Sequence, residues 1–353
     1  MIDYLQKLVS LYPVTSNQAS VKQLLDYVGA HFEARGMTAT HHIHAGIHNL
    51  YISTTNTKHC KVLLQSHVDV VPGKHAFYLQ DDKAFGRGVY DMLYAVAAFM
   101  HLADEIPMRN YDLAFMLSGD EETGGFSGVR QLLQAGYTAD ICILPDAGNG
   151  FGSLNVGAKG VFNVTVRIRG RSHHGSRPWE GDGAAAKLVR FLSELETVFD
   201  TSDQHNSTMT IAQLQAGNAS NQGPSTADAV LDIRYKDQDD LKRIEKAIDA
   251  LLQRHNGEII ATRRGSDYKL DLAHPLVAHF IEMYGTHAGK NIAFTKAHGS
   301  SDARFFSEQG IPVIMLRPDG GGAHGEVEWL SLASYEAFYD LLKEYVVSVA
   351  TKV

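Results

Sequence analysis

The order of apolar segments along this chain is the feature that most constrains its fold. Short runs rich in Val, Ile and Leu at 60–70, 112–119 and 139–146 alternate with segments of helical periodicity at 91–104 and 128–136. Strands that alternate with helices are typical of a mostly parallel sheet with helices on both faces. The sequence therefore predicts an α/β fold for this part of the chain.

The pattern changes near residue 160. A strand, a helix, two strands, a helix and a final strand are expected at 160–170, 183–199, 207–217, 226–235, 239–255 and 257–265. This β-α-β-β-α-β order is ferredoxin-like. It predicts a compact α+β domain of residues 160–267, small but within the usual size range of domains.

The alternation of strands and helices resumes at about residue 268, with a further strand expected within 311–318. We therefore predict that residues 1–159 and 268–353 form one α/β domain, into which the ferredoxin-like domain is inserted. A chain of 353 residues is long enough for this arrangement.

Composition excludes several classes of function. The formal net charge is −8 and no block rich in Lys or Arg occurs, which argues against nucleic acid or an anionic membrane as a partner. No apolar stretch approaches the roughly 20 residues that span a bilayer. The start of the chain does not resemble a signal peptide. Cys60 and Cys142 stand alone in apolar segments, so we expect reduced thiols and a cytoplasmic location.

Acids and a histidine follow the predicted strands of the first domain. His67 and Asp69 end the first strand, Glu121 and Glu122 follow the second, and Asp146 follows the third. Open α/β sheets bind their ligands at the carboxyl ends of the strands. Each residue also has an ordinary interpretation, such as a polar strand end, an acidic turn or the start of a turn, and it is their combination that predicts a site.

Two more candidates lie elsewhere in the chain. Asp91 precedes a predicted helix, where it could simply be an N-cap, and His324 lies in a glycine-rich loop where core packing does not explain it. Imidazoles and carboxylates without cysteine suit zinc, cobalt or manganese. The set is too large for one structural zinc and about right for two metals that share a bridging carboxylate.

The chain carries sequence blocks that occur in this order: SHVDVVPG, GRGVYDM, GDEETGG, PDAG with the later GAKG, and AHGEVEWL. Through these blocks the sequence resembles the M20 family of metallopeptidases and deacylases. That family includes acetylornithine deacetylases, succinyl-diaminopimelate desuccinylases, glutamate carboxypeptidases and dipeptidases. The resemblance covers nearly the whole chain. It implies a zinc-exopeptidase-like catalytic domain and hydrolysis of amide bonds in small substrates or short peptides.

The resemblance also implies a role for each residue of the site. One divalent ion, zinc or else cobalt or manganese, would be held by His67, Asp91 and Asp146, and a second by Asp91, Glu122 and His324. Asp69 would orient His67, and Glu121 would be the general acid/base.

In the inserted domain the block GRSHHGSRP resembles a lid motif, which makes His174 rather than His173 the residue that reaches the substrate. Asn221 and Arg234 match blocks that bind a substrate carboxylate, and Lys159 matches a recurring position. The segment 298–306 resembles a block that lines the site. The resemblance therefore implies that residues 160–267 form a lid and dimerisation domain and that the protein is a homodimer.

The sequence departs from the family pattern at two places. Leu93-Tyr94 replaces a usual Lys-Gly, and Asp146 stands where deacylases usually carry Glu. The second departure favours an exopeptidase that acts on short peptides, with an N-acyl-amino-acid deacylase as the alternative. A non-catalytic binding protein on the same fold and a nucleotide-dependent enzyme, suggested by the loop 148–152, are the other classes. No helical pattern follows that loop, as phosphate binding would require.

Overall fold

The computed structural model describes residues 1–74, 76–299 and 301–352. The segment 298–306 contains Ser300, which lies outside the described residues. The chain divides into two compact units. The first comprises Met1–Gly157, Lys269–Ala297 and the segment from Ser301 onwards, and the second comprises Ala158–Tyr268 with the short segment that begins at His298.

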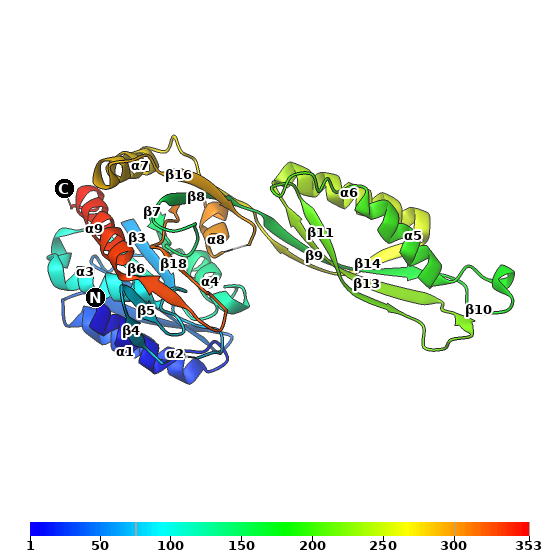
Figure 1. The fold of residues 1–353 in the computed structure, drawn as a ribbon, viewed down its shortest axis with the longest axis horizontal. Helices are drawn as coiled ribbons and strands as arrows, with labels where there is room; N and C mark the ends of the chain where they lie inside the picture. The colour runs from blue at the N-terminus through cyan, green and yellow to red at the C-terminus, as the bar shows by residue number, and fades with distance from the viewer. Residues whose placement is uncertain (75, 300, 353) are drawn as a thin grey trace. The chain divides into compact units, whose positions relative to one another are not determined.

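The first unit is built on a six-stranded sheet in the order β1-β2-β6-β3-β7-β17 (Figure 1). Its strands are β1 (Thr38–His44), β2 (Ile47–Ser53), β3 (His59–His67), β6 (Leu113–Ser118), β7 (Thr138–Ile143) and β17 (Val313–Ile314). The four strands from β6 to β17 are parallel, whereas β1 and β2 are antiparallel to their neighbours. The predicted mostly parallel sheet is confirmed.

Helices cover this sheet. They are α1 (Ile2–Leu11), α2 (Gln18–Glu33), α3 (Leu93–Glu105), α4 (Val129–Gln134), α7 (Pro275–Ala288), α8 (Ala303–Glu308) and α9 (Leu332–Val349). Every residue of β6 is buried, so both faces of that strand are covered, as is usual for parallel strands. On one face Phe115 packs against Phe32 of α2 and Phe99 of α3, with ring centroids 4.5 and 5.7 Å away.

Two smaller sheets lie mostly within the first unit. One has the order β15-β8-β16 and consists of β15 (Tyr268–Lys269), β8 (Ser153–Ala158) and β16 (Ala293–Ala297). The other has the order β18-β19-β5-β4 and consists of β18 (Gly320–Gly321), β19 (Trp329–Ser331), β5 (Lys83–Phe85) and β4 (Tyr78–Gln80). Among the described residues, none of the helices combines the length and apolar character needed to cross a membrane.

The second unit has the predicted ferredoxin-like order. Its elements are β9 (Gly160–Arg169), α5 (Ala184–Glu196), β11 (Thr208–Ala216), β13 (Thr226–Tyr235), α6 (Gln238–His255) and β14 (Gly257–Gly265). The strands form an antiparallel sheet in the order β11-β13-β9-β14. Alternate residues of β9 are buried in a core that they share with apolar residues of α5 and α6. A short pair, β10 (His173–His174) with β12 (Gln222–Gly223), is added to this core fold.

Two features of the main sheet differ from expectation. The strand expected within 311–318 is reduced to Val313–Ile314. Pro312 cannot donate a ladder hydrogen bond, and the backbone of Met315 pairs instead with Asn155 in an isolated bridge. The hairpin of β1 and β2 was not anticipated, because β1 is exposed along most of its length and so shows no alternation of apolar residues. Ala45 and Gly46 form its two-residue turn, both with positive φ.

Candidate metal centre

The strand ends of the main sheet bring the predicted acids and histidine to one edge. His67 is the last residue of β3 and pairs in register with Ser118, the last residue of β6. Glu121 and Glu122 lie in a single 3₁₀ turn just after β6, and Asp146 follows β7 by three residues. Since these strands are parallel, their carboxyl ends meet at the same edge, where the sequence placed the site.

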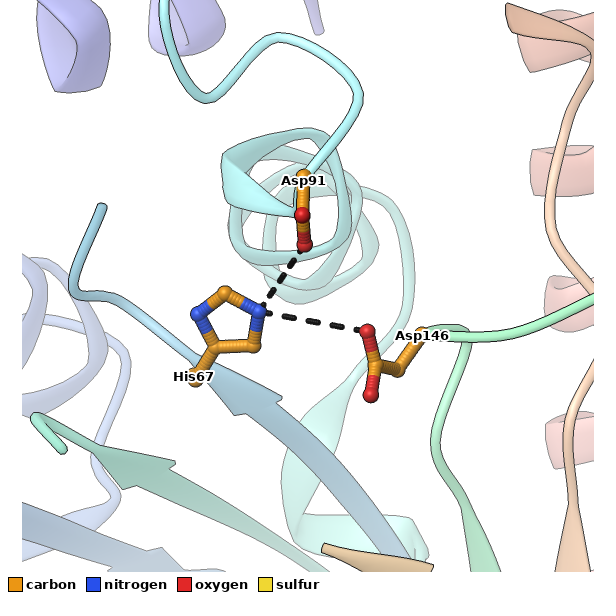
Figure 2. Close-up of side chains that lie close together, drawn as sticks. All are labelled: His67, Asp91 and Asp146. Atoms are coloured by element: carbon orange, nitrogen blue, oxygen red, sulfur yellow. Dashed lines mark hydrogen bonds and ion pairs between the residues drawn. The ribbon is translucent and has the colours of Figure 1, made fainter. Parts of the chain in front are cut away.

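A first group of possible metal ligands consists of His67, Asp91 and Asp146. Nε2 of His67 lies 3.1 Å from Oδ1 of Asp91 and 3.9 Å from Oδ1 of Asp146 (Figure 2). Asp91 precedes α3, whose N-cap is Met92, and so the Asp91 side chain does not cap the helix. It points toward His67 instead, which argues against the ordinary N-cap interpretation.

A second group consists of Asp91, Glu122 and His324. Nε2 of His324 lies 3.2 Å from Oδ2 of Asp91 and 2.9 Å from Oε2 of Glu122. The loop that carries His324 connects β18 to β19, and His324 has φ of 61°, a left-handed conformation that is uncommon outside glycine. Residues in such conformations cluster at functional sites.

The Asp91 carboxylate is shared by the two groups. Its Oδ1 faces His67 and its Oδ2 faces His324. A carboxylate with one oxygen directed to each of two ligand sets could bridge two divalent ions. The donors are imidazole nitrogens and carboxylate oxygens, and this set suits zinc and related divalent ions.

The ionisation of the site fits the binding of cations. Burial raises the pKa of Glu122 to about 7, and burial together with the charge of Asp146 raises the pKa of Glu121 well above its usual range. The hydrogen bond to Asp91 is the largest cause that raises the pKa of His324, to about 9. Without a cation the cluster therefore holds protons that divalent ions would displace, as metal sites do.

Asp69 acts on the site differently from expectation. Nδ1 of His67 lies 2.9 Å from the backbone oxygen of Asp69, whereas the nearer carboxylate oxygen is 3.6 Å away. With Nδ1 donating to this carbonyl, Nε2 of His67 is left to bind a metal. The Asp69 carboxylate instead accepts hydrogen bonds from the backbone N–H groups of Glu121 and Glu122, at 3.1 and 3.3 Å. Asp69 thereby links His67 to the pair of glutamates.

A profile of the family described as "Peptidase family M20/M25/M40" matches residues 63–348 of the chain. The chain belongs to this family. It is 25% identical over 366 residues to a succinyl-diaminopimelate desuccinylase of Sulfurovum sp. (strain NBC37-1), with 98% of each chain covered. It is 28% identical over 368 residues to a succinyl-diaminopimelate desuccinylase of Xylella fastidiosa (strain M12), covering 95% of this chain and 94% of that relative.

Solved structures share the fold. A tripeptidase from Staphylococcus aureus has a TM-score of 0.82 at 20% identity, and an aminopeptidase from Bacillus cereus has a TM-score of 0.83 at 17% identity. Each comparison covers 99% of this chain and 97% of the other. The resemblance seen in the sequence motifs is confirmed, and the protein is an M20 hydrolase of the peptidase and deacylase type. Membership implies divalent metal use, with which both ligand groups are compatible.

In the second unit of this M20 hydrolase, the two neighbouring histidines have different surroundings. The His173 ring packs closely against Gly223. A Cβ added at Gly223 would lie 2.2 Å from Nε2 of His173. His174 is exposed, and its Nδ1 lies 2.8 Å from the Ser176 hydroxyl. Asn221 lies beside it, because its backbone oxygen accepts a hydrogen bond from Gly175 at 2.6 Å. Of these two neighbours, His174 is therefore the exposed one.

The two basic side chains predicted to bind substrate, Arg234 and Lys159, already have hydrogen-bond partners within the protein. The Arg234 guanidinium makes a bidentate pair with Asp232 on the same strand, at 2.8 and 3.0 Å. The Lys159 ammonium is largely buried and donates to the backbone oxygens of Gln204, at 2.7 Å, and Asn206, at 2.5 Å. In this conformation Lys159 has a structural role, and its contribution to substrate binding stays a prediction.

Sequence reasoning missed a buried pair that supports the site, Arg87 and Glu328. Glu328 accepts hydrogen bonds from the backbone N–H groups of Gly88, Tyr90 and Asp91, at 2.9 to 3.0 Å. The signal was present in the motif AHGEVEWL, where an acid follows His324 by four residues and stands next to the apolar strand. Only the fold shows that this acid faces Asp91.

Proposed function

We propose that this protein is a di-metal exopeptidase that cleaves short peptides with a free carboxylate. The observation that carries the proposal is the sharing of Asp91 between two ligand groups, with Glu121 beside them. We assign the first ion to His67, Asp91 and Asp146 and the second to Asp91, Glu122 and His324. Zinc is our first choice because the donors are nitrogen and oxygen, with cobalt or manganese as alternatives.

Glu121 has the properties of the general base in this proposal. Its backbone N–H is held by Asp69, and it belongs to neither ligand group. A carboxyl whose pKa is raised by burial accepts a proton near neutral pH more readily than an exposed one. Divalent ions at the site would supply polarisation of the scissile carbonyl and a lower pKa for water.

In the proposed reaction Glu121 transfers a proton, and residues of the second unit bind the substrate. Glu121 takes a proton from the attacking water as its oxygen bonds to the carbonyl carbon, and gives that proton to the leaving amine as the C–N bond breaks. The second proton of the water stays on the new carboxyl group, which then ionises, so the products are a carboxylate, an amine and one proton. We propose that His174 donates a hydrogen bond to the oxyanion that forms during this step, and that Asn221 and Arg234 bind the substrate carboxylate.

The choice of peptides rests on Asp146, which stands where deacylases of the family usually carry Glu. The second candidate is an N-acyl-amino-acid deacylase, because the sequence relatives of 25 and 28% identity are named succinyl-diaminopimelate desuccinylases. For a peptide substrate, Arg234 must exchange or share its bond to Asp232 when a carboxylate binds.

A substrate panel distinguishes these two candidates. Protein loaded with zinc, cobalt or manganese is given dipeptides, tripeptides, their C-terminal amides, and N-acetyl and N-succinyl amino acids. The peptidase proposal predicts faster release of amine from a dipeptide than from the N-acetylated amino acid, and slower cleavage of the amide. Preference for an acylated amino acid would show that the protein is a deacylase rather than a peptidase. Equal cleavage of the C-terminal amide and the free peptide would contradict the binding of the substrate carboxylate by Asn221 and Arg234.

We further propose that the protein is a cytoplasmic homodimer that associates through the second unit. The edge strands β11 and β14 of that unit expose Ile211, Leu214, Ile259 and Ile260. The reduced, buried thiols of Cys60 and Cys142 are consistent with the cytoplasm. Sedimentation equilibrium tests the dimer, and substitution of Leu214 by Lys should shift it toward the monomer.

A further inference from the structure

Tyr94 is a buried aromatic residue close in sequence to the shared carboxylate of Asp91. It lies in the first turn of α3, three residues after Asp91, and its side chain is completely buried (0% exposed). Its hydroxyl donates a hydrogen bond to the backbone oxygen of Pro145. Pro145 directly precedes Asp146, so one side chain connects the segment of the shared carboxylate to the loop of the other carboxylate in the first ligand group.

The position of Tyr94 is fixed from its other side by α9. The Tyr335 hydroxyl donates to the backbone oxygen of Tyr94 at 2.6 Å. The Tyr94 ring packs edge-to-face against Tyr335 and Phe338, with centroids 5.7 Å away in both cases. A buried aromatic ring with these neighbours has little rotational freedom, so its hydroxyl is held at one point in space.

The Asp146 loop has a second attachment that involves another part of the same region. Arg317 donates to the backbone oxygens of Asp146 at 3.1 Å and Gly148 at 2.9 Å. Its guanidinium lies 4.3 Å from the centre of the Tyr90 ring, and Tyr90 is the residue before Asp91. Tyr94 and Arg317 thus each join the Asp91 segment to the Asp146 loop, one through Pro145 and one through Asp146 itself.

We propose that Tyr94 is a positioning residue that sets the separation of the Asp91 and Asp146 carboxylates, and thereby the affinity of the first metal site. The inference rests on the metal sites proposed above. Groups that hold a ligand without touching the metal typically contribute 10–100-fold in metal affinity or activity.

The experiment is a metal titration of Tyr94→Phe, which keeps the buried ring and removes only the hydroxyl. Cobalt binding is followed by the visible absorption of the ion, with a chelator as competitor, so the readout does not depend on turnover. We expect roughly 10–100-fold weaker binding of one of the two ions and unchanged binding of the other. In a His67→Ala background, which removes a ligand of the first site, Tyr94→Phe should have no further effect on the remaining ion.

Tyr345→Phe is the matched control. Tyr345 is also buried and donates its hydroxyl to a backbone oxygen, that of Leu276, at 2.9 Å, but neither residue belongs to the site. Equal weakening by both substitutions would show a general loss of rigidity and overturn the inference. So would unchanged cobalt binding in Tyr94→Phe. Failure of the unsubstituted protein to bind two ions would instead overturn the proposed metal sites and the inference with them.

Discussion

Arg87 and Glu328 lie 241 residues apart in the sequence and form a buried ion pair, with 2.8 Å between Nη1 of the arginine and Oε2 of the glutamate. Arg87 also donates to the backbone oxygen of Gly325, the residue after His324, at 2.6 Å. Glu328 receives the backbone N–H of Asp91. The pair therefore joins the segments that carry the shared carboxylate and the histidine of the second ligand group.

Breaking this pair should be costly. In Glu328→Gln the Arg87 guanidinium keeps its buried position but loses its counter-charge, for which about 3–5 kcal/mol of destabilisation is typical. Chemical denaturation of the metal-free protein measures this change in the free energy of unfolding. The control is Glu258→Gln, which removes the partner of Arg169 in an exposed pair and should cost less than about 1 kcal/mol. Equal costs for the two substitutions would contradict a supporting role for Glu328.

The shared ligand predicts a metal count. Asp91→Ala removes one ligand from each group, so both sites should weaken and fewer than two ions should remain per chain after gel filtration. Elemental analysis provides the count. Asp140→Ala is a suitable control, because this exposed acid on β7 pairs with His59 at 3.3 Å and should leave two ions bound. A single tight ion that Asp91→Ala does not affect would rule out the bridge.

The adjacent glutamates should separate catalysis from metal binding. Glu121→Gln preserves the shape of the side chain and abolishes its basicity, so turnover at saturating metal should fall by roughly 10²–10⁴-fold while both ions stay bound. Glu122→Gln should weaken the binding of one ion instead. Parallel metal analysis and turnover measurements make the comparison. Near-normal turnover of Glu121→Gln would mean that another group is the base.

The two neighbouring histidines of the second unit should also differ. His174→Ala should leave the metal content intact and lower the rate by roughly the 10²–10³-fold expected for one lost oxyanion donor. His173→Ala should reduce the rate much less, although it removes a ring packed against Gly223 and should lower the melting temperature. Rates measured at saturating metal, with melting temperatures, test both. Equal rate losses would contradict the assignment of the oxyanion contact to His174 rather than His173.

Metal-free protein should lose stability as the pH rises. Burial raises the pKa of Glu122 from 4.5 to about 7 and that of Asp302 from 3.8 to about 7, and the hydrogen bond to Asp91 raises that of His324 from 6.5 to about 9. Each group binds more protons in the folded state than in the unfolded state, so folding loses stability between about pH 4 and 9.

Thermal unfolding at several pH values, with chelator or with zinc, tests this prediction. The melting temperature with chelator should fall from pH 5 to pH 8.5. Bound zinc displaces the protons from Glu122 and His324, so its stabilising effect should grow over the same interval. A melting temperature in chelator that rises steadily toward pH 8.5 would contradict the assigned direction.

Much of the site could be predicted from the sequence because its ligands follow strands. His67, Glu122 and Asp146 end or follow β3, β6 and β7, and parallel strands place their carboxyl ends at one edge whatever the details of packing. The strand and helix periodicities likewise determined the α/β class and the ferredoxin-like unit. The ordered motifs added the partners of these ligands and the family.

The tertiary structure decided which atoms meet. It showed that Asp69 contacts His67 through its backbone oxygen. It also showed that the Arg234 guanidinium is already paired with Asp232, and that Glu328 accepts the backbone N–H of Asp91. It also gave Tyr94 a partner in Pro145. These contacts join segments whose separation depends on how loops and helices pack, to within a few tenths of an ångström. Periodicity determines which face of an element is buried, but a hydrogen bond forms only where two such faces are brought together at bonding distance.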